Sequence, residues 1–129
     1  MVVPDYAYKS LAKVITDRKS VYTVSGGCVH SKSEVEQFMK SLLAQKEFRK
    51  ATHNSYAYRL VIDDGGILEG KQDDGETGAG NCILRELQRA YMANCIVVVT
   101  RYYGGIQLHA DRFKHVIQAT RILLQQADA

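Results

Sequence analysis

CIVVVTRYY, residues 95–103, is the stretch that decides the fold, because it is the most apolar strand-like segment of the chain. An unbroken run of β-branched residues is typical of a strand that other elements cover, so we expect it at the centre of a sheet. The other elements are assigned outward from this central strand.

Three further strands are expected before it. VYTVSGGCV (21–29) predicts a strand that bends or bulges at its glycines. YAYRLVID (56–63) predicts a second strand, and DDGG then turns the chain into a third strand from about Ile67 to Asp73. The last two strands therefore form a predicted antiparallel hairpin.

Three amphipathic helices separate or follow these strands. Apolar residues at helical spacing predict helices within 30–48, from Thr77 onward, and within 110–126. The predicted order is β-α-β-β-α-β-α. Helices that cover a sheet give an α/β (α+β) two-layer sandwich, with a four-stranded, mostly antiparallel or mixed sheet.

Length and composition agree with one domain spanning residues 1–129. The sequence has 46% hydrophobic and 24% charged residues and no apolar run long enough for a membrane span. Its first ten residues, MVVPDYAYKS, lack the apolar region expected of a signal peptide. Its cysteines, Cys28, Cys82 and Cys95, have no CxxC spacing, which argues against a disulfide framework and a zinc site. We expect a cytoplasmic protein without a metal, a cofactor or a membrane partner.

The acidic turn QDDGETGAG, residues 72–80, combines three carboxylates with three glycines. Thr77 is expected to cap the helix that follows, and free N–H groups near residues 78–80 would form an anion site. The carboxylates would repel a phosphate unless a cation intervened, and no Lys-Ser/Thr pair follows as in a P-loop. Alternatively, the carboxylates only stabilise the positive end of their own helix.

Arg101 is the second candidate, because strand alternation places it on one face with Val97 and Val99. A buried guanidinium needs a carboxylate or a bound anion, and we expect Asp74 or Glu76 to be its partner. Such a pair would hold the acidic turn to the central strand, either as an internal salt bridge or as part of an anion site.

Two other groups complete the candidates. Tyr102 and Tyr103 follow Arg101 and would either stack on a partner or serve as core and rim residues. His53 and Asn54 precede the second predicted strand. A histidine there would act as a general base, a metal ligand or a turn hydrogen-bonding group.

Three ordered motifs resemble the IMPACT family, also called the YigZ family: ATHNSYAYR (51–59), DDGETGAG (73–80) and VVVTRYYGGIQL (97–108). The resemblance covers Lys9 to Leu124, and DDGET with DRFKH (111–115) is similar to the eukaryotic form. It implies a fold like domain 2 of ribosomal protein S5. One departure is His109, which stands where the family usually has glycine.

The resemblance also implies a function. Eukaryotic IMPACT proteins restrain a starvation-responsive kinase of translation initiation by binding the activator of that kinase, and they are associated with actin. Some relatives carry an N-terminal RWD domain or a C-terminal ferredoxin-like domain, and we expect neither in residues 1–129. The leading hypothesis is therefore a non-enzymatic regulatory module of translation in the stress response that acts through protein contacts.

Two alternatives remain at this point. One is an RNA- or ribosome-binding module. The other is a hydrolase that uses His53 with Asp74 and Glu76, with or without a divalent ion. The predicted functional surface, which includes no assigned catalytic residue, consists of Asp73, Asp74, Gly75, Glu76, Thr77, Arg101, Tyr102, Tyr103, Gly104, Gly105, His53 and Asn54.

Overall fold

The computed structural model describes residues 1–127, and these residues form a five-stranded antiparallel sheet in the order β1-β2-β5-β3-β4. The strands are β1 (Lys9–Asp17), β2 (Ser20–Cys28), β3 (His53–Val61), β4 (Ile67–Gln72) and β5 (Cys95–Tyr102). The position of β5 in the middle of this order confirms the prediction from its apolar sequence. The β3–β4 hairpin is confirmed as well.

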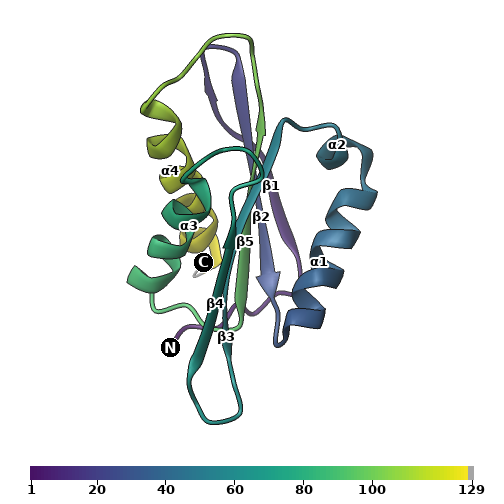
Figure 1. The fold of residues 1–129 in the computed structure, drawn as a ribbon, viewed down its shortest axis with the longest axis vertical. Coiled ribbons are helices and arrows are strands. Elements are labelled where there is room, and N and C mark those ends of the chain that lie inside the picture. The colour runs from purple at the N-terminus through teal and green to yellow at the C-terminus, as the bar shows by residue number, and fades with distance from the viewer. Residues whose placement is uncertain (128–129) are drawn as a thin grey trace.

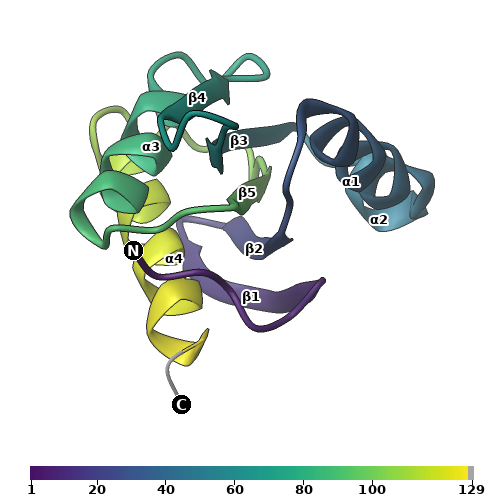
Figure 2. The same ribbon diagram turned by 90° about the horizontal axis from the view of Figure 1, so that it is seen from below.

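The helices lie on both faces of the sheet. Within the described residues they are α1 (Lys32–Ala44), α2 (Lys46–Arg49), α3 (Ala79–Arg89) and α4 (Asp111–Ala127). Figure 1 and Figure 2 show α3 and α4 side by side on one face of the sheet, with α1 and α2 on the other face. None of these helices has the length and apolar character needed to cross a bilayer.

Strand alternation in β5 divides the core between the two faces. Val97 and Val99 pack in the cluster that α3 and α4 cover, whereas Ile96 and Val98 pack in the cluster beneath α1. All four side chains are at most 2% exposed. The apolar run is therefore continuous because both of its faces are buried.

The α+β class with an antiparallel sheet packed against amphipathic helices is confirmed, and two elements are additional. The short helix α2 extends the end of α1, and β1 adds an edge strand beside β2. Lys13 in β1 has a φ of 54°, and the β1–β2 register shifts between Leu11 and Ile15. This irregularity interrupts the alternation by which a strand is recognised in a sequence.

The bulge expected at the glycines of β2 is wrong. Pairing with β5 continues without a shift through Gly26 and Gly27. A Cβ atom on Gly27 would lie 2.0 Å from the carbonyl oxygen of Ala7, so this position needs glycine because another backbone segment approaches closely. The register shift lies in the neighbouring strand β1 instead.

Asp17 connects the β1–β2 turn to α4 and makes the stability of the fold depend on pH. Hydrogen bonds from Arg18 and His115 lower the pKa of Asp17 from 3.8 to about 2. A carboxyl whose pKa is lower in the folded state contributes stability above its unfolded pKa, and this contribution disappears as the pH falls through the folded pKa.

We therefore expect the Asp17→Asn variant to lose less stability than the unchanged protein between pH 3.8 and about 2. Urea unfolding at several pH values in this window measures the difference. Asp5→Asn is the matched control, because Asp5 is exposed and has no hydrogen-bond partner among the described residues. Equal acid sensitivity of the Asp17→Asn variant and the control would contradict the role assigned to the Asp17 carboxyl.

Candidate functional site

Glu76 lies in the turn between β4 and α3 and is 4% exposed. Nη1 of Arg101, on β5, donates to both oxygens of its carboxylate at 2.8 and 3.0 Å. The predicted pairing of Arg101 with the acidic turn is confirmed, with Glu76 as the partner and not Asp74. The pair joins the turn to the central strand of the sheet.

Two further groups surround the same carboxylate. Nε2 of His53, at the start of β3, lies 3.2 Å from Glu76 Oε2, and Nε of Arg112, on α4, lies 3.6 Å from Oε1. We call Glu76, Arg101, His53 and Arg112 the Glu76 cluster. Arg112 is an addition to the predicted surface, because the sequence alone does not show that the start of α4 reaches the acidic turn.

Asp73 caps α3. Its Oδ2 accepts a hydrogen bond from the N–H of Gly78 at 3.0 Å, and its Oδ1 accepts one from Gly80 at 2.8 Å. The prediction that Thr77 caps this helix is therefore wrong, because Gly78 occupies the N-cap position and the carboxylate that bonds the first turn comes from five residues upstream of it.

The capping contacts lead to a stability prediction for Asp73→Ala. Losing both bonds to the first turn of α3 should lower the free energy of unfolding by about 1–2 kcal/mol. Urea unfolding measures this change. Asp63→Ala is the control because Asp63 is exposed in the β3–β4 turn and has no hydrogen-bond partner among the described residues. Equal stability of the two variants would contradict the capping role.

Asp74 and Asn54 join the acidic turn to β3. Oδ2 of Asp74 accepts a hydrogen bond from the backbone N–H of Asn54 at 2.7 Å. The carbonyl oxygen of Asp74 lies 2.8 Å from Nδ1 of His53. Both ring nitrogens of His53 therefore face acceptors, so neither is free to act as a general base.

Contacts within the protein already occupy the carboxylates of the acidic turn. Asp73 and Asp74 already accept backbone hydrogen bonds, and Glu76 lies among guanidinium groups. Among residues 1–127, no three His, Cys, Asp or Glu side chains are arranged to hold a metal ion. The carboxylates therefore serve to fix the turn in place.

Gly104 holds the β5–α4 connection against the β1–β2 turn, at the top of Figure 1. A Cβ atom on Gly104 would lie 2.1 Å from the carbonyl carbon of Lys19, and its N–H donates to Oγ of Ser20 at 3.3 Å. Gly105 and Gly75 have φ values of 90° and 86°. His109 has a φ of 52°, so the backbone adopts there the left-handed conformation that glycine favours.

The structure separates the two adjacent tyrosines. The Tyr103 ring lies 5.6 Å from Cζ of Arg101 and is on the same side as the Glu76 cluster. Tyr102 lies on the opposite face of the sheet, where its hydroxyl donates to the carbonyl oxygen of Glu47. Tyr102 is therefore a member of the predicted surface that lines a different pocket.

The Glu76 cluster opens into a pocket of about 240 Å³. We call it the Glu76 pocket. Its lining residues are Thr52, His53, Gly75, Glu76, Thr77, Arg101, Tyr103, Gln107 and Arg112. Most of them were predicted from the sequence, and they meet because β3, β5, the acidic turn and α4 converge at this end of the sheet.

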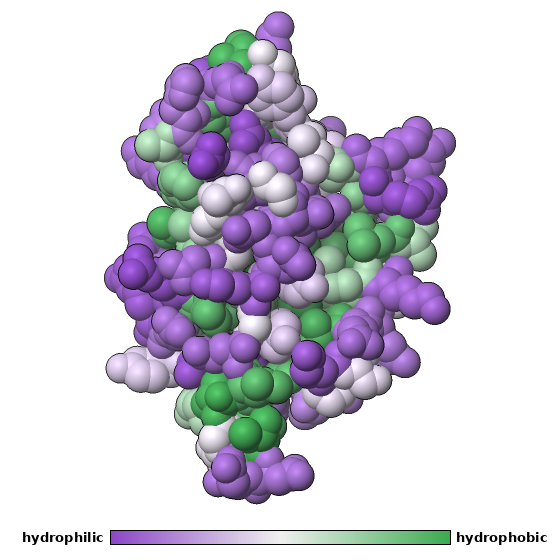
Figure 3. All heavy atoms as spheres, viewed as in Figure 1, coloured by the Kyte–Doolittle hydropathy of each residue, from purple (hydrophilic) through white to green (hydrophobic). Residues whose placement is uncertain are grey.

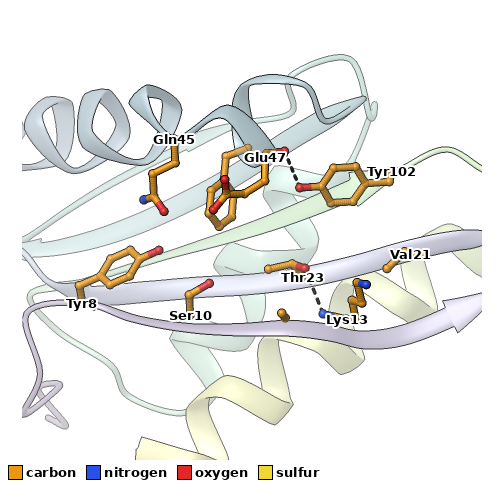
Figure 4. A pocket seen from close by; sticks show the side chains of 10 residues that line it. Tyr8, Ser10, Lys13, Val21, Thr23, Gln45, Glu47 and Tyr102 are labelled. Atoms are coloured by element: carbon orange, nitrogen blue, oxygen red, sulfur yellow. Dashed lines mark hydrogen bonds between the residues drawn. The ribbon is translucent and has the colours of Figure 1, made fainter.

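A larger, mostly apolar groove of about 620 Å³ lies on the other face, between β1–β2 and the α1–α2 junction (Figure 4). Tyr8, Thr23 and Tyr102 line it, and Phe48 of α2 lies beside them. The sequence does not indicate this groove, because it depends on β1, which was not predicted.

Figure 3 shows a second apolar area at the end of the β3–β4 hairpin, where Val61, Ile62 and Leu68 are 36%, 42% and 39% exposed.

Cys28 belongs to a Cys–His–Glu arrangement that the sequence does not indicate. Its Sγ lies 3.6 Å from Nε2 of His30, whose Nδ1 lies 3.2 Å from Oε1 of Glu34. Burial and the charge of Glu34 raise the pKa of the Cys28 thiol, which favours the neutral form. The backbone N–H groups of Cys28 and Val29 already bond carbonyl oxygens. The raised thiol pKa therefore disfavours the thiolate that a nucleophilic cysteine needs.

Comparisons with known proteins give a consistent result. The model of the Impact N-terminal domain family matches residues 18–124. Protein IMPACT-B of Xenopus tropicalis is 41% identical over 113 residues, which cover 87% of this chain and 36% of that protein. The Protein IMPACT homolog of Schizosaccharomyces pombe is 34% identical over 126 residues, which cover 98% and 45%. The chain thus spans less than half the length of these relatives.

Two solved structures are similar. One, described as a hypothetical protein, has a TM-score of 0.82 at 27% identity, with 96% of this chain and 59% of that chain covered. The other is the two-domain translational regulator Yih1, with a TM-score of 0.64 at 32% identity and coverage of 96% and 48%. The similarity to Yih1 therefore extends over nearly the whole of this chain.

Proposed function

Because the chain belongs to the Impact N-terminal domain family, we propose that it is a protein-binding module of translational control that contacts its partner around the Glu76 pocket. Yih1, a structural neighbour, is a translational regulator. The partner proposed here is the activator of the starvation-responsive kinase that phosphorylates the initiation factor, and binding it would restrain that kinase. The proposal implies a cytoplasmic location, because the translation machinery is found there.

The Glu76 cluster supports this proposal because it fixes a surface and leaves the rim of that surface exposed. Glu76 is held from β5, β3 and α4 by Arg101, His53 and Arg112. A turn held on three sides loses little conformational freedom when a partner binds, which favours affinity. Tyr103 is 44% exposed at the rim, and the Arg112 side chain is 34% exposed. Tyrosine and arginine are the residue types that often dominate binding energy.

The same geometry argues against the alternatives. A hydrolase would need a free base, but both ring nitrogens of His53 face acceptors. An RNA-binding surface would need a row of cations along the phosphate backbone. Around this pocket, however, the acidic turn and Asp111 at the start of α4 contribute carboxylates that repel an extended polyanion.

Retention of the kinase activator from a cell extract by the immobilised chain tests the proposal. We expect Tyr103→Ala to reduce retention at least about tenfold, as for a central aromatic contact. Tyr91→Ala is the matched control, since Tyr91 is 71% exposed and lies beyond the far end of α3. Failure of the unchanged chain to retain the activator, or equal retention by both variants, would refute the proposal.

A further inference from the structure

We propose that the Glu76 pocket binds a single oxyanion, a carboxylate or a phosphate monoester, that the protein partner carries. This inference rests on the proposed function and specifies the chemical group that the partner presents. The charge of the pocket, its unsatisfied hydrogen-bond donors and its size each support the inference.

The charge balance of the pocket is positive. The single carboxylate of Glu76 faces the guanidinium groups of Arg101 and Arg112, both within 4 Å. Asp73 and Asp74 keep their charges but do not line the pocket, because their carboxylates bond backbone N–H groups of α3 and β3. A second negative group would therefore complete the balance in a partly desolvated site, where charge-assisted hydrogen bonds are strong.

Two buried donors in the wall of the pocket lack hydrogen-bond acceptors among the described residues. They are Nε of Arg101 and Nε of Arg112. Arg101 is 6% exposed, and the 3.6 Å between Nε of Arg112 and Glu76 Oε1 is too long for a hydrogen bond. Unsatisfied buried donors on one side of a pocket favour an acceptor ligand.

The turn beside these side chains supplies further donors. The backbone N–H groups of Gly75 and Thr77 bond no acceptor in residues 1–127, and both residues line the pocket. The N–H of Glu76 between them bonds the carbonyl oxygen of Asp73. Free N–H groups of turns commonly bind anions. The Thr77 side chain is also exposed at the rim.

The size of the pocket limits the ligand to one small group. Its volume of about 240 Å³ is below the range of about 300–1,000 Å³ that is usual for larger ligands. Carboxylates at positions 73, 74 and 111 lie on the turn and helix beside it, so a polyanion such as RNA is disfavoured. A single acidic or phosphorylated side chain fits both restrictions.

Amide and arginine Nε chemical shifts of the ¹⁵N-labelled chain, recorded during titration with inorganic phosphate or acetate at constant ionic strength, test the inference. We expect saturable shifts at Gly75, Thr77 and Arg112 with at least one anion. The anion that binds more tightly identifies a phosphorylated or a carboxylate-bearing partner. Arg112→Gln should weaken binding at least about tenfold, because it removes a charge-assisted contact.

Lys114→Gln is the matched control. It removes a positive charge two residues after Arg112 on α4, and Lys114 does not line the pocket. Amide shifts outside the pocket verify that both variants remain folded. Absence of saturable shifts with either anion, or equal affinity in the two variants, would overturn the inference. Tighter binding of a single-stranded RNA, with a steep salt dependence and displacement of phosphate, would also overturn it.

Failure of this inference is distinguishable from failure of the proposed function. If neither anion binds but Tyr103 is still required to retain the activator, the oxyanion inference fails and the protein-binding function stands. If phosphate or acetate binds in an Arg112-dependent manner but the activator is not retained, the pocket is confirmed and the proposed partner is wrong.

Discussion

Replacing Arg101 with methionine is expected to lower the free energy of unfolding by about 3–5 kcal/mol, because the change leaves Glu76 as a buried charge without its main partner. Glu76 is 4% exposed, and Nη1 of Arg101 supplies both hydrogen bonds to its carboxylate. Domains of this size are stable by only about 5–15 kcal/mol, so the loss is a large fraction of the total. Urea unfolding measures it.

Two further variants identify the cause of this loss. Adding Glu76→Gln to Arg101→Met removes the stranded charge, so the double variant should be less destabilised than the sum of the single changes. Arg18→Met is the control for an exposed ion pair, because the Arg18 side chain is 38% exposed and pairs with Asp17 and Asp111. It should cost much less than Arg101→Met, because exposed ion pairs contribute little to stability. Equal costs for Arg18→Met and Arg101→Met would contradict the role assigned to burial.

Leu87→Ala is expected to have the second large effect, a loss of about 2–5 kcal/mol in the free energy of unfolding. Leu87 is 0% exposed and packs in the core cluster beneath α3 and α4. Truncation removes apolar contacts and leaves a cavity that the sheet cannot fill. Because α3 begins directly after the acidic turn, this packing also positions the Glu76 pocket.

Leu43→Ala is the matched control for Leu87→Ala. Leu43 lies on the helix α1 but is 37% exposed, so its truncation should cost less than about 1 kcal/mol. Urea unfolding of both variants provides the comparison. A similar loss in the two variants would mean that the buried side of α3 has been assigned incorrectly.

The sequence predicts the centre of the fold because the local pattern there agrees with the final packing. The run in β5 is apolar on both faces. In β3, Ala57 faces one core cluster and Tyr58 and Leu60 face the other, and a glycine-containing turn follows. Arg101 was predicted to pair with the acidic turn for a physical reason. A guanidinium at the end of a buried row must find a counter-charge, and the nearest carboxylate turn supplies it.

The remaining features depend on tertiary contacts that no local pattern contains. The edge strand β1 is irregular at Lys13, so the groove beside it was not predicted. Arg112 reaches Glu76 only because α4 packs across the end of the sheet. Tyr102 and Tyr103 are adjacent in the sequence, but they face opposite sides of the sheet, as neighbouring residues of a strand do.

Amide hydrogen exchange of the chain with and without the kinase activator is the most direct test of the central claim, that the surface around the Glu76 pocket binds a protein partner. We expect the activator to slow amide exchange at Gly75, Thr77, Tyr103 and Gln107, which are exposed at the rim of the pocket. Unchanged exchange at this rim, or protection confined to the groove between β1–β2 and α1–α2, would contradict the claim.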